Sequence, residues 1–237
     1  MNQESTSADL AGTDRDGRMV LDPFELRVLA VLAEKEALTP DIYPLSVNAL
    51  INGCNQLSSR DPVMSITEET VNDVLQRLLE KKLVAEVSQA GARVRKYEHR
   101  IRLKWTLEQD RLTILTQLIL RGVQTAGEIR TRAARMHEFL TVSEVETGLQ
   151  FLIDKFPPLV ARLARAPGTK EARYAQLLSG AEAVERQEVA SSFSSGSNVV
   201  GTSRADRVAQ LEEEVARLRS EVDSLTLQFN SFRKQFE

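Results

Sequence analysis

The chain has 237 residues, of which 42% are hydrophobic, with 31 Lys+Arg against 34 Asp+Glu and a formal net charge of −3. This composition fits a folded protein of one or two domains and excludes disorder throughout. Because no apolar run approaches the roughly 18 residues of a spanning helix and MNQESTSADL is not a signal peptide, we expect a cytoplasmic protein with no membrane contact. One Cys and two distant His exclude an internal disulfide and a zinc site, so we expect no cofactor or metal.

Two segments without a regular apolar pattern delimit the ordered parts. Residues 1–21 are rich in Ser, Thr, Asp and Gly, which predicts a disordered tail. Residues 179–203 are rich in Ser and Gly, which predicts a flexible linker, with a short helix as the alternative for AEAVERQEV within it. We therefore expect structured parts at residues 22–178 and 204–237.

An internal repeat organises residues 22–178. ITEETVNDVLQRLLEKK at 66–82 aligns with LTVSEVETGLQFLIDKF at 140–156, and further on Gly91 aligns with Gly168 and Tyr97 with Tyr174. The matched pairs in the aligned segments include Thr67 with Thr141, Val71 with Val145, Leu75 with Leu149, and Gln76 with Gln150. The sequence therefore predicts two copies of one unit, at 22–105 and 106–178.

The first copy is predicted to form three helices and a hairpin. Asp22 as N-cap and Pro23 at the first helical position begin the first helix. Thr67 caps the third helix, and after Leu83 the pattern alternates around Gly91, which predicts a hairpin within 84–103. The apolar face of the second helix comprises Val47, Leu50, Ile51, Cys54 and Leu57. The buried stripe of the third comprises Val71, Val74, Leu75, Leu78 and Leu79.

The second copy repeats this order. Capping-box spacing at Thr106–Gln109, Thr125–Glu128 and Thr141–Glu144 predicts three helix starts. Pro157-Pro158 ends the last helix, and residues 159–178 form a hairpin that turns at Pro167-Gly168. Three helices followed by a hairpin make a winged helix, whose third helix can enter a DNA major groove. The predicted fold is mainly α with small β-hairpins: two tandem winged-helix domains followed by a C-terminal coiled-coil helix.

Residues 204–237 carry apolar side chains at alternating steps of three and four, as a coiled-coil seam requires. Val at the a positions and Leu at the d positions favour a parallel homodimer, and the alternative is a single amphipathic helix folded back on the domains. The predicted dimerisation residues are Val208, Leu211, Val215, Leu218, Val222, Leu225 and Phe229.

Two stretches carry a resemblance to a known family. YPLSVNALINGCNQLSSRDPVMSITEETV at 43–71 and GTKEARYAQLL at 168–178 closely resemble the YceH-like family of uncharacterised bacterial proteins. NALINGCNQ followed by SSRDPV is more specific than the generic fold requires. The resemblance covers residues 20–178 and implies a tandem winged-helix fold and a bacterial source. It implies no catalytic residue, because the family has no settled activity.

The sequence contains no enzyme signature: a Walker A loop, Gly-x-Gly-x-x-Gly, Gly-x-Ser-x-Gly and His-Glu-x-x-His are all absent. We therefore expect a protein that is not an enzyme. His99, which lies among Arg and Lys in the first hairpin, and His137 at a helix end are interpreted as solvated side chains. Cys54 is interpreted as a small buried hydrophobe rather than a reactive thiol.

A basic hairpin in each copy indicates contact with the backbone of double-stranded DNA. Residues 85–104 hold six basic and two acidic side chains, and residues 159–178 hold four and one. The predicted backbone-binding residues are Arg93, Arg95, Lys96, Arg100, Arg102, Lys104, Lys170 and Arg173. The second helix of the second copy adds Arg130, Arg132 and Arg135.

The third helices give a mixed signal. Asn72, Gln76 and Arg77, on the exposed face of the first, are residue types that read base edges. Acidic residues share that face, however, and they repel phosphate. The third helix of the second copy is net acidic and carries Phe151 where the first copy has Arg77. An outward aromatic side chain indicates packing against the other copy or a protein partner.

Two hypotheses remain. In the first, the protein is a dimeric, DNA-associated, regulator-like protein whose basic wings hold the duplex backbone. In the second, it is a protein-interaction scaffold that uses its winged-helix faces, like the accessory subunits of bacterial condensin complexes. A continuous basic surface free of the acidic third helices would favour the first hypothesis. Basic residues that are scattered or paired with Glu would favour the second.

Overall fold

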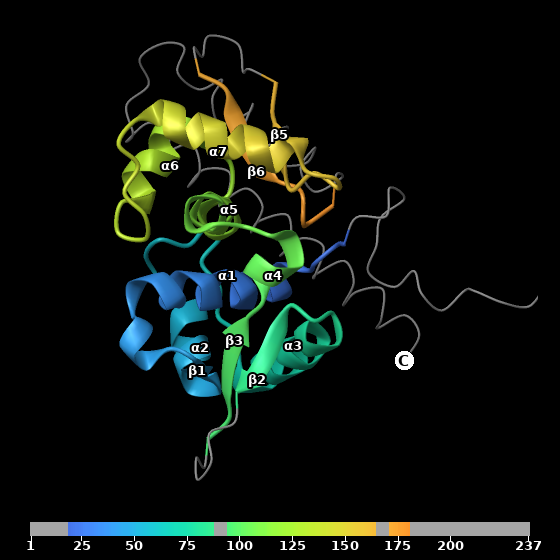
Figure 1. Cartoon of the computed structure of the whole chain (residues 1–237). Helices are drawn as coiled ribbons and strands as arrows, with labels where there is room; N and C mark the ends of the chain where they lie inside the picture. Colours follow the sequence, from blue (N-terminus) through green and yellow to red (C-terminus); the bar gives the residue numbers. More distant parts are fainter. Residues whose placement is uncertain (1–18, 88–93, 165–170, 181–237) are drawn as a thin grey trace, which may run out of the picture. The chain divides into compact units, whose positions relative to one another are not determined.

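The computed structural model describes residues 19–87, 94–164 and 171–180, which belong to one compact unit (Figure 1). The predicted linker apart from Ser179 and Gly180 lies outside these ranges, as do the coiled coil with all its dimerisation residues, Arg93 and Lys170. Most of the predicted tail does too, but its last residues belong to the fold. Leu21 is buried, and its backbone N–H donates to the carbonyl of Leu178 at 2.8 Å.

The described part has seven α-helices and two small antiparallel sheets, so it is mainly α as predicted. The first copy contains α1 (Pro23–Leu38), a 3₁₀ turn (Pro40–Ile42), β1 (Leu45–Ser46), α2 (Val47–Cys54), α3 (Glu68–Glu80), β2 (Val84–Val87), β3 (Lys96–His99) and α4 (Ile101–Trp105). The second contains α5 (Gln109–Arg121), β4 (Gln124–Thr125), α6 (Ala126–Ala133), α7 (Val142–Asp154), β5 (Val160–Arg162) and β6 (Arg173–Gln176).

The two sheets have equivalent topologies. Their strand orders are β1-β3-β2 and β4-β6-β5, so in each copy a two-residue strand before the second helix pairs with the last strand of the hairpin. Leu45 pairs with Tyr97 in the first sheet, and Gln124 pairs with Tyr174 in the second. Tyr97 and Tyr174 are the residues that the internal alignment matched. The repeat seen in the sequence is therefore a repeat of element order and strand register.

The helix starts follow the predicted caps with one exception. Asp22 and Thr125 each form a complete capping box, with Glu25 and Glu128. Thr67 and Thr141 also cap their helices, but the Glu144 carboxylate accepts from the N–H of Leu140 rather than from that of Thr141. The prediction at Thr106 is wrong. Thr106 lies in the left-handed region (φ 50°) at the end of α4, and the N-cap of α5 is Glu108.

Two other boundaries differ from prediction. The first hairpin ends at His99, and the residues expected to continue it form α4 instead. Leu57 lies beyond the end of α2 and is 84% exposed, so it does not belong to the apolar face of that helix. The remaining members of that face begin at Val47 and end at Cys54, which is fully buried as expected.

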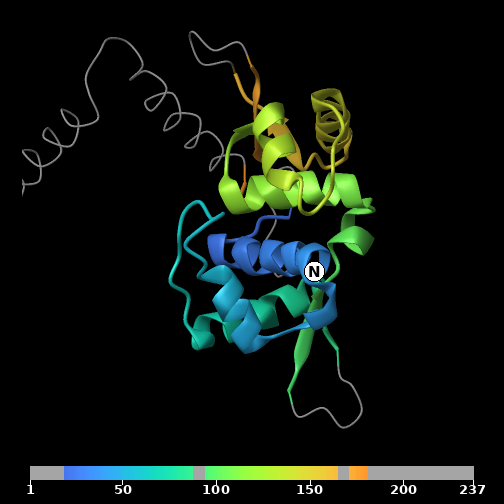
Figure 2. The same ribbon diagram turned by 90° about the vertical axis from the view of Figure 1, so that its left-hand side faces the viewer.

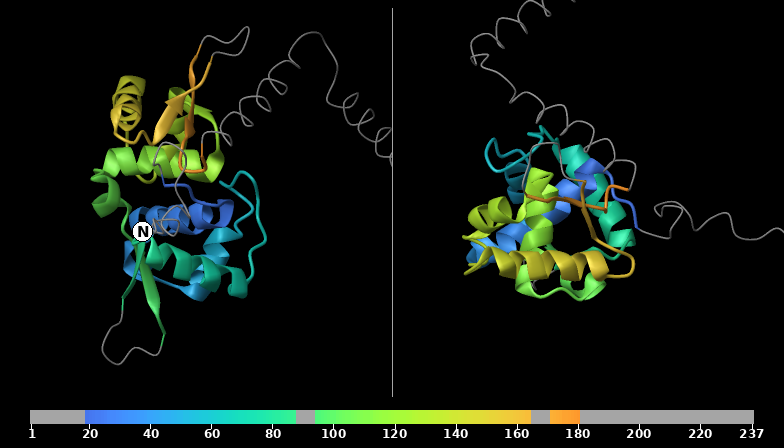
Figure 3. Two further views of the ribbon diagram at one scale, coloured as in Figure 1. Left: turned by 90° about the vertical axis from the view of Figure 1, so that its right-hand side faces the viewer. Right: turned by 90° about the horizontal axis from the view of Figure 1, so that it is seen from above.

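The two copies stack through α1 and α5, and one continuous core includes residues of both (Figures 2 and 3). Every residue from Glu25 to Glu34 is buried, because α1 contacts α2, α3 and β3 of its own copy as well as α5 of the other. Close approach of α2 to α1 requires glycine at position 53. A Cβ there would lie 2.6 Å from Cγ1 of Val31, whose branched side chain has little rotamer freedom in a helix.

The hairpins extend from opposite ends of this stack, β2–β3 at the bottom and β5–β6 at the top of Figure 1. Figure 2 and the left panel of Figure 3 show the same arrangement. Among the helices of the described residues, none combines the length and the apolar character needed to cross a membrane.

Candidate nucleic-acid interface

A groove of about 800 Å³ lies between α3 and the first hairpin. Asn72 and Gln76 line it from α3, and Arg95 and Tyr97 line it from the hairpin side. The amphipathic pattern of α3 explains the placement, because its buried stripe leaves Asn72 and Gln76 on the opposite, exposed face. The structure thus brings together three of the residues that the sequence singled out for DNA contact.

The charges around this groove do not favour phosphate. Glu68 and Asp73 line it with Arg95, so the described lining carries two carboxylates and one guanidinium. Arg95 itself is 3.8 Å from the carboxylate of Glu86 across the hairpin. Both side chains of this pair are exposed, so the interaction is weak and screened by salt. The described lining of the groove is therefore net acidic.

Arg77, the third predicted base-reading residue, does not line the groove. Its guanidinium is 2.8 Å from Asp22 and 3.4 Å from Glu25, and Lys81 lies 2.7 Å from the same Glu25 carboxylate. The two basic residues connect α3 to the N-terminus of α1. Arg77 therefore has a structural role within the copy, which sequence spacing did not reveal.

Arg102 is also held by carboxylate and amide partners. It donates to Glu36 at 3.1 Å and to Gln109. Nε2 of His99 lies 3.1 Å from the same Glu36 carboxylate, while Nδ1 accepts from the N–H of Ile101. The hydrogen bond from His99, opposed by burial and helped by Arg102, holds the pKa of Glu36 below its ordinary value. His99 is buried, so its interpretation as a solvated side chain is wrong; His137 is half-buried.

The other basic residues of the predicted interface are dispersed. Arg100 is 3.6 Å from Glu98, and Lys96 lies on β3, opposite Ser46 and Val87. Lys104 lies on α4, and Arg173 lies on β6 in the other sheet. Since the hairpins extend from opposite ends, these described residues do not form one continuous basic surface (Figure 1).

The exposed aromatic residue of α7 is covered from within its own copy. The guanidinium of Arg111 lies 4.4 Å from the ring centroid of Phe151, and the ammonium of Lys155 lies 5.2 Å from it. With these cation–π contacts Phe151 is 38% exposed. Phe151 therefore packs on its own copy, and the exposed face of α7 remains acidic through Glu146 and Asp154.

A second groove, of about 410 Å³, was not expected from the sequence. Trp105, Phe156 and Leu178 contribute apolar side chains, and Lys104 and Lys155 contribute ammonium groups. Phe156 is 98% exposed, which is unusual for a phenylalanine. The signal in the sequence was an aromatic residue directly before Pro157-Pro158, where the buried stripe of α7 has already ended.

Two stacked copies of a unit with three principal helices and a small antiparallel sheet define the class of this protein. The chain belongs to the family described as "Protein of unknown function, DUF480", whose model matches residues 21–169. A "UPF0502 protein" of Janthinobacterium sp. (strain Marseille) is 60% identical over 237 residues, the full length of both chains. A "UPF0502 protein" of Azoarcus sp. (strain BH72) is 50% identical over 222 residues, 94% of this chain and 96% of the relative. Membership is consistent with the resemblance to the YceH-like family of uncharacterised bacterial proteins.

Proposed function

We propose that the two copies are tandem winged helices and that they act as a protein-interaction scaffold. The element order supports the winged helix: in each copy the third principal helix leads directly into a hairpin, and a short strand before the second helix completes the sheet. Dimerisation through the heptads of residues 204–237 is a further part of the proposal.

The observation that carries the scaffold proposal is the distribution of charge. Arg95, Arg100 and Arg102 of the first hairpin region lie near carboxylates, the hairpins extend from opposite ends, and the exposed faces of α3 and α7 carry acidic residues. A protein that binds the duplex backbone instead gathers unpaired cations on one face. This arrangement is the one that favours the second of the two hypotheses.

The groove beside Phe156 is the proposed docking surface. An exposed aromatic next to an apolar floor is typical of an interaction site, and Phe156, at 98%, is the most exposed large hydrophobic residue in the part of the chain that the structure describes. Lys104 and Lys155 add positive charge at the same place. The partner would therefore be a protein segment with apolar anchor side chains and an acidic flank.

Replacing Phe156 with serine is expected to reduce capture of the partner by at least about tenfold, because an anchor aromatic contributes 2 kcal/mol or more at an interface. Tagged wild type and variant would be compared by quantitative mass spectrometry after capture from the source bacterium. Leu140→Ser is the matched control, because Leu140 is 72% exposed but does not line the groove. A set of captured proteins that both variants leave unchanged would contradict this docking surface.

DNA association is the second candidate, and the specific observation in its favour is the groove that gathers Asn72, Gln76 and Arg95. Fluorescence anisotropy on a random duplex of about 30 base pairs, from about 50 to 200 mM salt, separates the candidates. The scaffold proposal predicts a Kd no tighter than about 100 µM even at the lower salt. Micromolar binding that weakens about a thousandfold over this range would favour DNA association. Changing Arg93, Arg95 and Lys96 to Ala would then flatten the salt dependence if the first wing is responsible.

A further inference from the structure

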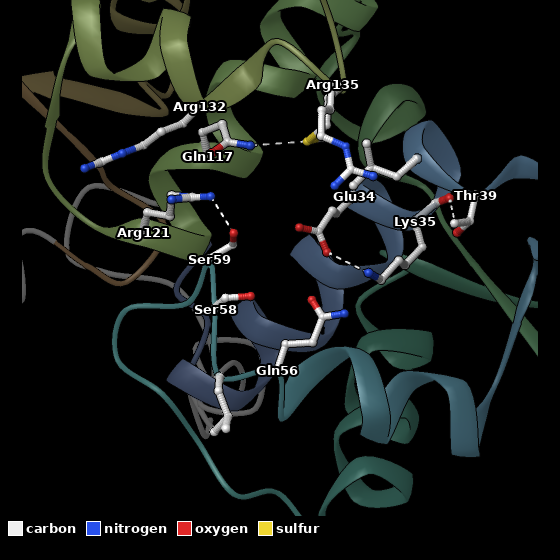
Figure 4. A pocket seen from close by; sticks show the side chains of 13 residues that line it. Glu34, Lys35, Thr39, Gln56, Ser58, Ser59, Gln117, Arg121, Arg132 and Arg135 are labelled. Atoms are coloured by element: carbon white, nitrogen blue, oxygen red, sulfur yellow. Dashed lines mark hydrogen bonds and ion pairs between the residues drawn. The ribbon is translucent and has the colours of Figure 1, made fainter.

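A cavity of about 470 Å³ lies between the two copies (Figure 4). Its walls come from the C-terminal half of α1 and the segment after α2 in the first copy. The second copy contributes α5 and the end of α6 with the residues that follow it. A ligand in this cavity would contact both copies at once.

The cavity is strongly positive. Lys35, Arg121, Arg132 and Arg135 line it, and among its described lining residues the one carboxylate is that of Glu34. Glu34 is already neutralised, because the buried Arg60 guanidinium donates to its two oxygens at 3.0 and 2.6 Å. The positive charge at the cavity therefore exceeds what the described carboxylates balance.

Two of the arginines keep most of their hydrogen-bonding capacity for a ligand. Arg121 donates to Oγ of Ser59 at 2.6 Å, and no described carboxylate lies within ion-pair distance of it. Arg135 has neither a hydrogen bond nor an ion pair with any residue that the structure describes, and Figure 4 shows it across the cavity from Arg121. Arg132 differs, because it donates to Gln124 at 2.9 Å and lies 3.5 Å from Glu128.

The pKa of Arg121 is consistent with a site that would be stabilised by a bound negative charge. Burial, and then the neighbouring positive charge of Arg132, lower the pKa of Arg121 from its ordinary value. A bound anion would offset both effects, since it would supply the opposite charge at hydrogen-bond distance. The guanidinium group presents a planar fork of donors that matches phosphate oxygens.

The rest of the lining indicates what the anion would be attached to. Gln56, Ser58 and Thr39 offer amide and hydroxyl groups, and Oε1 of the buried Gln117 has no donor among the described residues. The described lining contains no aromatic side chain on which a nucleobase would stack. The volume is within the range of small-molecule sites, about 300–1,000 Å³.

We propose that this cavity binds a small phosphorylated polyol, such as a sugar phosphate. Arg121 and Arg135 hold the phosphate group, and Gln56, Ser58 and Thr39 bind hydroxyl groups of the ligand. This site goes beyond the proposed scaffold function and does not depend on it. Because both copies contribute side chains, the bound ligand fixes one copy against the other.

Isothermal titration calorimetry on the full chain at about 50 mM salt tests the proposal, since this ionic strength leaves charge interactions only partly screened. The probes are glucose 6-phosphate, glucose, inorganic phosphate and AMP. We expect glucose 6-phosphate to bind with a Kd below about 1 mM, which corresponds to about −4 kcal/mol. Glucose should not bind, and inorganic phosphate and AMP should each bind at least about tenfold more weakly, which is 1.4 kcal/mol.

Arg121→Gln and Arg135→Gln are each expected to weaken the binding of glucose 6-phosphate by at least about tenfold, because each removes a charged hydrogen-bond donor. Arg162→Gln is the matched control: Arg162 is exposed on β5 and does not line the cavity. Thermal melts of all three variants establish that they are folded.

Several results would overturn the proposal. Absence of saturable binding of glucose 6-phosphate, or unchanged affinity in both cavity variants, would show that the arginines do not form a phosphate site. Equal affinity for inorganic phosphate and glucose 6-phosphate would exclude the polyol part of the ligand, and tighter binding of AMP would replace it with a nucleotide. None of these outcomes depends on whether the protein binds DNA or another protein.

Discussion

Replacing Arg60 with alanine is expected to lower the free energy of unfolding by about 3–5 kcal/mol, because it removes the guanidinium that donates to both oxygens of the buried Glu34 carboxylate and leaves only the ion pair with Lys35 among the described residues. The Arg60 side chain is fully buried, and its guanidinium donates twice to Glu34. The same group also donates to the carbonyl oxygens of Gly53 and Ser59 and to the side chain of Gln56. One side chain thus connects α1, the end of α2 and the segment that follows it.

A double variant separates the value of the ion pair from the cost of breaking it. Glu34→Leu with Arg60→Met removes both charges and keeps apolar volume, so much of the lost stability should return. Urea unfolding followed by circular dichroism gives the free energy of unfolding of the wild type, Arg60→Ala and the double variant under one condition. A loss of less than about 1 kcal/mol in Arg60→Ala would show that water replaces the guanidinium at this position.

The pH dependence of stability provides an independent test of the ion pair between Glu34 and Arg60. Burial alone would raise the pKa of Glu34, but the hydrogen bond and charge of Arg60, with Lys35, hold it below the ordinary value of 4.5. A carboxylate with a depressed pKa stabilises the fold above its unfolded pKa and loses that contribution as the pH falls through the folded pKa. The stability of the wild type should therefore fall more steeply below about pH 4.5 than that of the double variant.

Features that depend on local sequence were the ones predicted well. The caps at Asp22, Thr67 and Thr125 involve residues within a few positions of each other, so their spacing alone indicates the helix starts. The prediction of a helix start at Thr106 was wrong because α4 has only five residues and ends where the next helix was expected to begin. A helix this short depends on tertiary packing, which no local pattern encodes.

The third strand of each sheet was missed for a related reason. β1 and β4 have two residues each, too few to show an alternating pattern. They exist because a partner far along the chain pairs with them, Tyr97 with Leu45 and Tyr174 with Gln124. Only the alignment of Tyr97 with Tyr174 in the repeat pointed to these positions.

The candidate sites were harder to predict than the sheets, because they too depend on contacts between residues far apart in the sequence. Asn72, Gln76 and Arg95 were chosen from the sequence and do share a groove, whereas Arg77 and Arg102 have carboxylate partners that spacing did not reveal. The cavity could not be predicted from the sequence, because its cations come from both copies and meet only when α1 packs on α5. Arg132 and Arg135 were noted in the sequence, but for contact with DNA.

The sequence of α1 reflects the central position of this helix in the fold. Leu26 to Ala33 includes apolar residues all around the helix rather than on one face, which is typical of a helix buried on every side. The first copy standing alone would leave in water the side of α1 that contacts α5. The apolar residues around α1 are consistent with the core that the two copies share, although the sequence was interpreted as two separate domains.

Replacing Leu115 with alanine is expected to lower the free energy of unfolding of the whole described unit by about 2–5 kcal/mol, the usual cost of deleting a fully buried leucine. Leu115 has no exposed surface, and it belongs to α5, the helix that packs on α1. Because one core joins the copies, loss of packing in the second copy also destabilises the first. Leu140→Ala is the matched control; its leucine is 72% exposed, so a change within about 0.5 kcal/mol is expected.

The shared core also predicts how the variant unfolds. Trp105, the single tryptophan, ends α4 in the first copy and lines a groove with Phe156 and Leu178 of the second, so its fluorescence reports on the contact between the copies. In Leu115→Ala the fluorescence and circular dichroism transitions should shift together to lower urea and remain coincident. Two separated transitions, with a circular dichroism change that continues after the fluorescence change is complete, would show that the first copy stays folded when the second unfolds. In that case the contact between α1 and α5 would contribute little stability, and a ligand in the cavity would be needed to fix the two copies together.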